Sequence, residues 1–296
     1  MTDHEILAAD TTMGPVTLLV GDLDAMTKYY RDAVSLRVLV GAERAAGTDA
    51  DNTVTLGRGT TPVIILVHAP ELKHASAHEA GLFHTAILFE TEEALAAAVY
   101  SVAQKYPNTF TGSSDHLVSK AFYFTDPEGN GVELYWDRDR SAWSWTHGTL
   151  EMSTLYLDPN LFLREHLTEA AVAEPVIGGA TVGHVHLQVG DVETARQFYV
   201  HLLGFETMGE LPGSALFVSA GGYHHHLAMN TWNSRGAGPR QLALGLSRID
   251  IRVPSNDDLG ALTERMSHHG IQIRDDGRAV SFDDPWANTI TVGSTN

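Results

Sequence analysis

Hydrophobic and polar positions follow the same order in two distant parts of the chain. VTLLVGDLDAMTKYYRDAVSL, near the start, aligns without a gap with VHLQVGDVETARQFYVHLLGF in the second half, so that Asp22 matches Asp191 and Tyr30 matches Tyr199. In each copy an alternating apolar pattern, typical of a strand, leads to an acidic residue, after which apolar positions recur every three or four residues. Each segment is therefore predicted to begin a strand and helix unit.

A second pair of segments carries a related pattern. GLFHTAILFET and the helix expected from Thr91 to Lys105 resemble GLSRIDIRVPS and the helix expected near Asp257 to His268, and FYFTDPEGNGVELYW downstream corresponds to VSFDDPWANTITVG. After each expected helix come short strand-like runs separated by Gly, Asn, Asp or Pro. The repeats predict four modules, which span residues 14–70, 82–138, 182–232 and 245–294.

These modules predict an α+β fold of four βαβββ units arranged as two tandem domains. The first domain is expected at residues 1–141 and the second at 179–296. The intervening residues 142–178 break the repeat, and DPNLFLREHLTEAA within them predicts a linker helix that starts after an Asp-Pro pair.

Composition narrows the classes of function. The chain has 296 residues, of which 43% are hydrophobic and 19% charged, and its net charge is −18. This charge opposes nucleic acid and anionic membranes as partners, and no apolar run is long enough to span a bilayer. The acidic N-terminus lacks the features of a signal peptide, so a cytoplasmic location is expected. Because the chain has no cysteine, any metal ligands must be His, Asp or Glu.

Comparison of the modules separates residues that the fold needs from residues that serve a site. Metal-capable side chains fall only in the second and third modules. The residues at the start of the first strand of each module are Pro15, His84, His184 and Arg248. The matching positions in the last strand are an apolar run, Glu133, the triplet His224 to His226, and Thr291.

Glu133 stands between Val132 and Leu134 on a predicted strand, so it points to the face opposite these apolar residues. A buried carboxylate without a partner costs several kcal/mol, a cost that a divalent cation shared with imidazoles removes. By the same alternation, His224 and His226 are expected on one strand face and His225 on the other. A lone strand histidine is more often a structural residue, and the Asp-Pro turn at Asp126 is explained by turn formation alone.

The repeats and two of their motifs resemble the vicinal oxygen chelate superfamily, which includes glyoxalase I, extradiol ring-cleaving dioxygenases and drug-sequestering resistance proteins. SSDHLVSKAFYFTDPEGNGVELYWDR resembles the extradiol signature, and SALFVSAGGYHHHLAMNTW resembles the two-domain catechol-2,3-dioxygenases. The signature positions are His116, Phe122, Tyr123, Asp126, Pro127, Gly129 and Glu133. The resemblance implies two tandem glyoxalase-like domains.

The resemblance also implies roles for individual residues. Glu133 and His84 correspond to metal ligands, and His116 and Tyr123 to residues that line the site and assist proton transfer. The family's third ligand would fall at Pro15, which is a departure, and His184 is the expected replacement. His226 is expected to act as a fourth ligand or as a catalytic base.

The implied function is an Fe(II)-dependent extradiol dioxygenase of aromatic hydrocarbon catabolism. Its partners would be a small aromatic diol and O2, and the sequence leaves open a homo-oligomer. Mn, Ni or Zn are alternative metals, since these ligands accept several ions. The alternative functions are a glyoxalase-like lyase or isomerase, favoured if His226 is a true ligand, and a non-catalytic protein that binds aromatic drugs.

Overall fold

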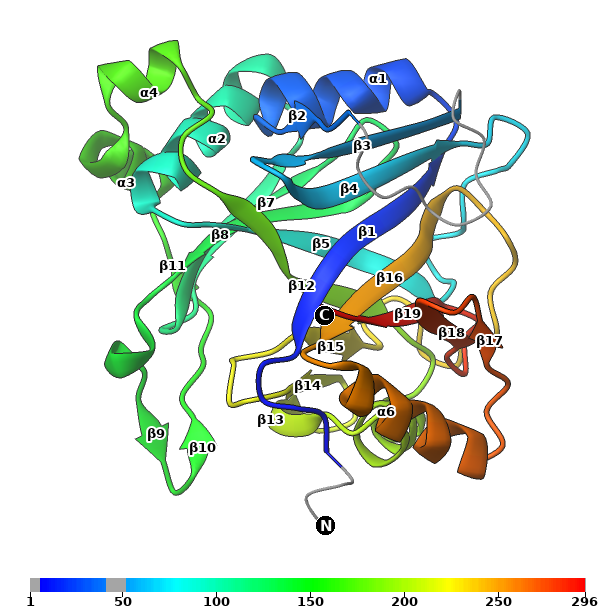
Figure 1. The fold of residues 1–296 in the computed structure, drawn as a ribbon. Helices are drawn as coiled ribbons and strands as arrows, with labels where there is room; N and C mark the ends of the chain where they lie inside the picture. The colour runs from blue at the N-terminus through cyan, green and yellow to red at the C-terminus, as the bar shows by residue number, and fades with distance from the viewer. Residues whose placement is uncertain (1–5, 41–51, 296) are drawn as a thin grey trace. The chain divides into compact units, whose positions relative to one another are not determined.

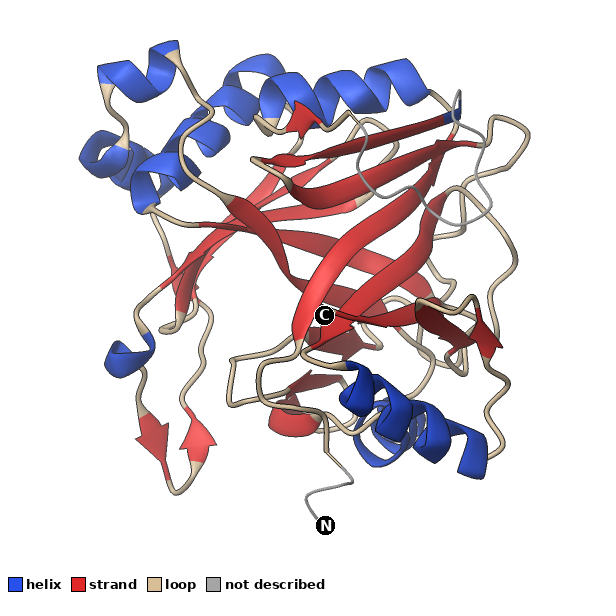
Figure 2. Cartoon of the chain, viewed as in Figure 1, coloured by secondary structure: helices blue, strands red, loops and turns tan. Residues whose placement is uncertain are grey.

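The computed structural model describes residues 6–40 and 52–295 (Figure 1). Their contacts divide them into two units. The N-terminal unit contains the described residues of Thr17–Leu72 and His84–Val182, and the C-terminal unit contains those up to Val16, Lys73–Phe83 and the chain from Gly183 on. Both are built mainly from strands with few helices (Figure 2), which confirms the predicted α+β class. The domain limits at 141 and 179 stay a prediction.

The sheets of the N-terminal unit contain short antiparallel hairpins and the parallel pair of β5 and β8. In one sheet β4, β3 and β2 are antiparallel neighbours. In the other, β11, β6, β7 and β8 are antiparallel neighbours and β5 lies parallel to β8. The strands that lie wholly or partly in this unit are β1 (Thr12–Val20), β2 (Arg37–Val38), β3 (Thr53–Arg58), β4 (Thr61–His68), β5 (Gly81–Phe89), β6 (Phe110–Asp115), β7 (Ser119–Thr125), β8 (Gly131–Asp137), β9 (Trp145–Thr146), β10 (Thr149–Leu150) and β11 (Leu155–Tyr156).

The helices of this unit start at capping residues that the sequence indicates. The side chains of Asp22, Thr91 and Asp158 each accept a hydrogen bond from a backbone N–H of the first turn, which satisfies donors that have no partner inside the helix. The helices are α1 (Leu23–Lys28), the π-helix η2 (Tyr29–Ala33), α2 (Glu92–Lys105), the 3-10 turn η4 (Arg140–Ala142), α3 (Pro159–His166) and α4 (Glu169–Ala173). The linker helix predicted after Asp158 is therefore present as α3.

The C-terminal unit repeats this pattern. β15 lies parallel to β12 and β16 lies parallel to β19, whereas β13, β14 and β15 are antiparallel neighbours, as are β17, β18 and β19. Its remaining strands, of which β12 lies only partly in this unit, are β12 (Ala180–Gln188), β13 (Glu206–Leu211), β14 (Ala215–Ser219), β15 (Leu227–Asn230), β16 (Gly245–Val253), β17 (Arg274–Asp275), β18 (Ala279–Asp283) and β19 (Thr289–Ser294). Its helices are α5 (Val192–Arg196), the π-helix η5 (Gln197–Leu202) and α6 (Asn256–His268).

The two faces of the sheet that contains β5 and β8 have different roles. Side chains alternate along β5 and β8, so Ile87 and Leu134 share one face while His84 and Glu133 lie on the other. The first face packs beneath α2, which contacts β8. On the second face, Ala86, Ala121 and Tyr135 form a small buried apolar cluster. This cluster supports the face that carries the polar site residues.

No helix within the described ranges is long and apolar enough to cross a membrane.

Candidate functional site

His84 and Glu133 come together on the parallel pair β5 and β8. In the register of these strands Ala86 lies opposite Glu133, so His84, two positions earlier on the same face, is its diagonal neighbour. Nε2 of His84 lies 2.9 Å from Oε2 of Glu133. Both residues are buried, at 6% and 3% exposure. The N-terminal unit therefore holds a nitrogen and a carboxylate oxygen side by side in its interior.

The spacing of these two atoms suits a metal ion. Two ligands about 2.1 Å from a metal and at a right angle to each other are separated by about 3.0 Å. The distance between Nε2 of His84 and Oε2 of Glu133 matches that value. Imidazole with carboxylate is a donor set that Fe(II), Mn(II), Ni(II) and Zn(II) accept. The pair fits a metal centre on the geometry of its own donors.

Tyr123 and His116 extend the same surface. Tyr123 on β7 lies directly opposite Glu133 on β8, and its ring centroid is 5.7 Å from that of His84. Its hydroxyl oxygen is 2.7 Å from Nε2 of His116, which follows β6. Four residues predicted from the sequence for one site, His84, His116, Tyr123 and Glu133, thus form a connected group in the N-terminal unit.

The hydrogen bonds of His116 define its tautomer. Nδ1 lies 2.7 Å from the backbone oxygen of Ser153, which can only accept, so Nδ1 carries a proton. In the neutral ring Nε2 is then the acceptor, and the Tyr123 hydroxyl donates to it. Ser153 comes from the linker, whose β11 pairs with β6. The linker therefore orients a predicted catalytic histidine, a contact that sequence reasoning missed.

Burial keeps Tyr123 protonated. Desolvation, and after it the negative charge of Glu133, raise the pKa of the Tyr123 hydroxyl well above its ordinary value. At neutral pH the hydroxyl is thus a hydrogen-bond donor that can hold or pass on a proton.

The turn at Asp126 is a structural feature that has a counterpart in the other unit. The Asp126 carboxylate accepts hydrogen bonds from the Tyr30 hydroxyl, at 3.0 Å, and from the backbone and side chain of Asn130. In the other unit, Asp284 makes the same contacts to Tyr199 and Asn288. Since only one copy leads into a strand with a glutamate, the turn serves the fold, and in the N-terminal unit it sets where β8 begins.

The third-module histidines do not lie where the alternation argument expects them. His224 to His226 belong to the loop between β14 and β15, so the prediction that they sit on a strand with alternating faces is wrong. His224 and His225 turn toward His184 instead. Adjacent glycines at 221 and 222, both with positive φ, form the turn that displaces the triplet from the strand.

The register of the paired strands also corrects the sequence alignment of the last strands of the modules. Glu133 pairs with the residue two positions after His84, and in the fourth module Thr291 pairs with Asp250, two after Arg248. The corresponding residue in the third module is Ala228, which pairs with His186. The triplet is therefore not the counterpart of Glu133, whereas Thr291 is.

His226 has its own partners inside the C-terminal unit. Its Nδ1 accepts a hydrogen bond from the backbone N–H of Ala220 at 3.2 Å and lies 3.0 Å from the Ser219 hydroxyl. His186, on the same face of β12 as His184, contacts Asn230 at 3.0 Å. The roles of His226 and His184 at a metal stay predictions.

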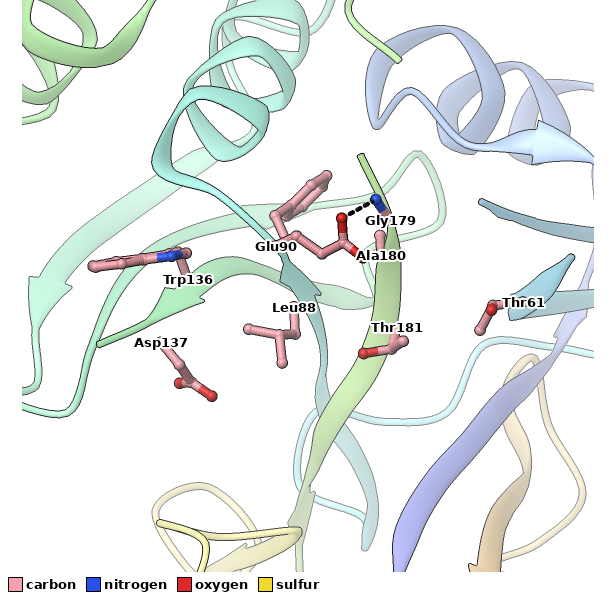
Figure 3. Close-up of a pocket in the computed structure, with 9 residues that line it drawn as sticks. Thr61, Leu88, Glu90, Trp136, Asp137, Gly179, Ala180 and Thr181 are labelled. Carbon is pink, nitrogen blue, oxygen red and sulfur yellow. Dashed lines mark hydrogen bonds between the residues drawn. The ribbon is translucent and has the colours of Figure 1, made fainter. Parts of the chain in front are cut away.

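A cavity of about 240 Å³ lies elsewhere in the N-terminal unit (Figure 3). It is lined by residues from the far ends of β5 and β8, including Leu88 and Trp136, whereas His84 and Glu133 lie near the starts of these strands. The Glu90 carboxylate at its wall accepts a hydrogen bond from the backbone N–H of Gly179 at 2.8 Å. This cavity is separate from the His84 and Glu133 pair.

Comparison with known proteins finds matches that include residues of both units. The family model described as the Glyoxalase/Bleomycin resistance protein/Dioxygenase superfamily matches residues 12–134 and 181–292. A curated protein of Bacillus subtilis (strain 168), named catechol-2,3-dioxygenase, is 34% identical over 280 residues, which cover 93% of this chain and 94% of the relative.

Solved structures with the same fold have low sequence identity. A putative dioxygenase from Bacillus subtilis matches with a TM-score of 0.67 and 15% identity, over 98% of this chain and 86% of its own. Glyoxalase I from Zea mays matches with a TM-score of 0.57 and 16% identity, over 96% and 92% of the two chains. These likenesses show two tandem glyoxalase-like domains.

Proposed function

Because the chain belongs to the glyoxalase, bleomycin resistance protein and dioxygenase superfamily, we propose that it is a metal-dependent extradiol dioxygenase that opens the ring of a catechol-type aromatic diol. The observation that carries the proposal is the buried pair of His84 and Glu133 connected to Tyr123 and His116. The relative that bears the name catechol-2,3-dioxygenase supports the same reaction.

His84 and Glu133 would hold the metal through Nε2 and a carboxylate oxygen. The chemistry that a bound Fe(II) ion supplies is to hold a diol and dioxygen side by side and to lower the pKa of the diol hydroxyl. We take iron as the metal because the proposed reaction needs an ion that works with dioxygen. His184 is the third ligand predicted from the repeats, and His226 is a predicted base or further ligand.

Tyr123 and His116 supply a route for one proton. The Tyr123 hydroxyl donates to Nε2 of His116, so a proton removed from the diol can pass to the Tyr123 oxygen as the phenol's own proton moves to Nε2. The resulting imidazolium keeps its hydrogen bond to the carbonyl of Ser153. Because burial disfavours a charged phenolate, Tyr123 ends each transfer protonated and His116 stores the charge.

Oxygen uptake tests this proposal directly. Protein loaded with Fe(II) under anaerobic conditions is mixed with catechol and air, and the yellow colour of a ring-opened semialdehyde is followed together with oxygen consumption. We expect both signals from the natural protein and neither from Glu133→Ala. A matched control is Thr291→Ala, which removes the side chain at the equivalent register position of the fourth module.

The result also separates the proposal from a glyoxalase-like reaction. An enzyme of that kind would hold nickel or zinc and would consume no oxygen with any diol. Tight binding of nickel or zinc, no oxygen uptake across a panel of catechols, and turnover of a thiohemiacetal would contradict the dioxygenase.

A further inference from the structure

The turn of residues 115–119 carries His116 from β6 into β7. Asp115 is the last residue of β6 and Ser119 is the first residue of β7. The backbone N–H of His116 donates to the carbonyl of Ser119 at 2.9 Å. The next backbone N–H, that of Leu117, donates to Oδ1 of Asp115 at 2.9 Å. Two hydrogen bonds therefore fix the backbone from which the imidazole projects.

Leu117 has a backbone conformation that residues with a Cβ atom rarely adopt. Its φ is 69°, in the left-handed region. Its side chain is 40% exposed, so burial of the leucine does not account for this conformation. An aspartate that accepts a hydrogen bond from the N–H two residues later forms an Asx turn. The Asp115 carboxylate therefore holds Leu117, and with it the neighbouring His116, in place.

The C-terminal unit contains the same turn without the histidine. Residues 275–279 join β17 to β18, and the N–H of Asp276 donates to the carbonyl of Ala279 at 3.2 Å. The N–H of Gly277 donates to Oδ1 of Asp275 at 2.8 Å. Here glycine occupies the left-handed position, with a φ of 84°, and it does so at no steric cost. Only the copy that carries the histidine keeps a strained residue, and such strain points to a functional constraint.

Arg138, which follows β8, holds the Asp115 carboxylate from the other side. Its Nη2 donates to Oδ2 of Asp115 at 2.6 Å, so the two carboxylate oxygens bind different partners. The backbone N–H of Arg138 donates to the carbonyl of Val118 at 2.9 Å. Both charged side chains are partly buried. Arg138 thus ties the end of β8 to the turn that carries His116.

These contacts set the direction of the His116 ring. Its Nδ1 lies 2.7 Å from the carbonyl oxygen of Ser153, and its Nε2 lies 2.7 Å from the Tyr123 hydroxyl. Hydrogen bonds weaken steeply as their angle departs from linear. A turn that twisted would therefore weaken one of these bonds or both, and the ring could then exchange between its two neutral tautomers.

We propose that Asp115 and Arg138 are positioning residues for the proton route, which keep His116 in the tautomer that carries its proton on Nδ1 and accepts from Tyr123 through Nε2. They act through His116 and not as catalytic residues. The effect on the reaction rests on the proposed function. The tautomer itself is a property of the chain and can be measured without metal, diol or dioxygen.

Nitrogen-15 NMR of the metal-free, full-length chain gives the first test. The two ring nitrogens of a neutral imidazole differ in chemical shift according to which one carries the proton, and comparison with His116→Gln identifies the signals of His116. We expect protonated Nδ1 in the natural protein. In Asp115→Ala we expect loss of this single tautomer, because both hydrogen bonds of the carboxylate are gone.

Two milder variants separate the contributions of the carboxylate oxygens. Asp115→Asn and Arg138→Met each leave an oxygen that can accept from the N–H of Leu117 and each remove the ion pair. Both should therefore give the same result, between those of the natural protein and Asp115→Ala.

Oxygen uptake by the iron-loaded protein gives the second test. A misplaced base loses part of the rate that proton transfer contributes, so kcat of Asp115→Ala should fall by at least about 10-fold, with KM and iron content unchanged. The matched control is Asp275→Ala, which removes the same hydrogen bond from the counterpart turn. It should change neither kcat nor the tautomer of His116. Circular dichroism checks that each variant is folded.

Protonated Nε2 on His116 in the natural protein, or an Asp115→Ala variant with the natural tautomer and natural kcat, would overturn the inference. If Asp115→Ala does not fold, natural values in both Asp115→Asn and Arg138→Met would overturn it as well. A natural protein that consumes no oxygen would contradict the dioxygenase instead, while the tautomer still decides whether these residues position His116.

Discussion

The hydroxyl oxygen of Tyr123 lies 2.7 Å from Nε2 of His116, and the carbonyl of Ser153 on Nδ1 sets the direction of that hydrogen bond. Tyr123 is at the same time the cross-strand partner of Glu133. The phenol therefore stands between the proposed metal ligands and the imidazole of His116, whose Nε2 accepts its hydrogen bond. This arrangement makes the Tyr123 hydroxyl the most informative atom to remove.

Tyr123→Phe should slow the reaction without loss of the metal. Removal of the hydroxyl breaks the route to His116, and proton transfer by a positioned side chain typically contributes about 10²–10⁴-fold in rate. We expect kcat to fall by at least about 10²-fold, with KM and bound iron nearly unchanged. Steady-state oxygen uptake and iron content measure these quantities.

The control is Tyr156→Phe, because Tyr156 is 84% exposed on β11. Its kinetics should match those of the natural protein. A Tyr123→Phe variant with full kcat would show that His116 receives its proton by another path.

Metal retention should depend on Glu133 and His84 but not on Thr291. Nε2 of His84 and Oε2 of Glu133 lie 2.9 Å apart, the separation expected of two neighbouring ligands of one metal ion. Either substitution removes one of these two donor atoms. We expect Glu133→Ala and His84→Ala to lose iron on gel filtration, and Thr291→Ala to keep as much iron as the natural protein. Iron content by elemental analysis decides, and equal loss in all three variants would contradict the proposed ligands.

In each unit a tyrosine donates a hydrogen bond to the buried aspartate of the turn, and the two tyrosines should contribute equally to the free energy of unfolding. Tyr30→Phe and Tyr199→Phe each remove a hydrogen bond to a buried aspartate, which is worth about 1.5–3 kcal/mol when the acceptor is charged. We expect the free energy of unfolding, measured in urea, to fall by that amount in each variant. If only one substitution destabilises the protein, the two turns are not structural equivalents.

Stability should depend on pH through Asp126. Burial raises the pKa of this carboxyl to about 6, so the folded state binds the proton more tightly than the unfolded chain does. Its contribution to stability is present below the unfolded pKa and is lost as the pH rises through about 6. A difference of about two pH units corresponds to about 3 kcal/mol.

Asp126→Asn should flatten the fall in stability between about pH 4 and pH 6, in addition to a general loss from broken hydrogen bonds. Urea unfolding at a series of pH values measures the slope. Asp276→Asn is the contrast, because hydrogen bonds from Ala279 and Arg278 lower the pKa of that exposed carboxyl and its contribution has the opposite sign. An unchanged slope in Asp126→Asn would rule out Asp126 as the titrating group.

Local signals in the sequence were sufficient to predict the repeated strand and helix units and several of the candidate site residues. Helix starts at Asp22, Thr91 and Asp191 depend on a side chain that caps its own first turn, so neighbouring residues determine them. Alternation along β8 placed Glu133 on the face opposite Val132 and Leu134, because side-chain direction in a regular strand has a period of two. The extradiol signature brought in His116 and Tyr123, and the structure places the Tyr123 hydroxyl 2.7 Å from Nε2 of His116.

Contacts between distant segments were decided only by the tertiary structure. Alternation failed for His224 to His226 because two glycines with positive φ take the chain out of the strand, and the register of β12 and β15 places Ala228 where a ligand was expected. The tautomer of His116 depends on Ser153, 37 residues away, whose carbonyl meets the ring only through strand pairing of the linker. The alternation of side chains along a strand and the capping of a helix depend on residues that are close in the sequence, so both can be predicted from it. Strand register and the contact of a side chain with distant backbone exist only once the strands have paired.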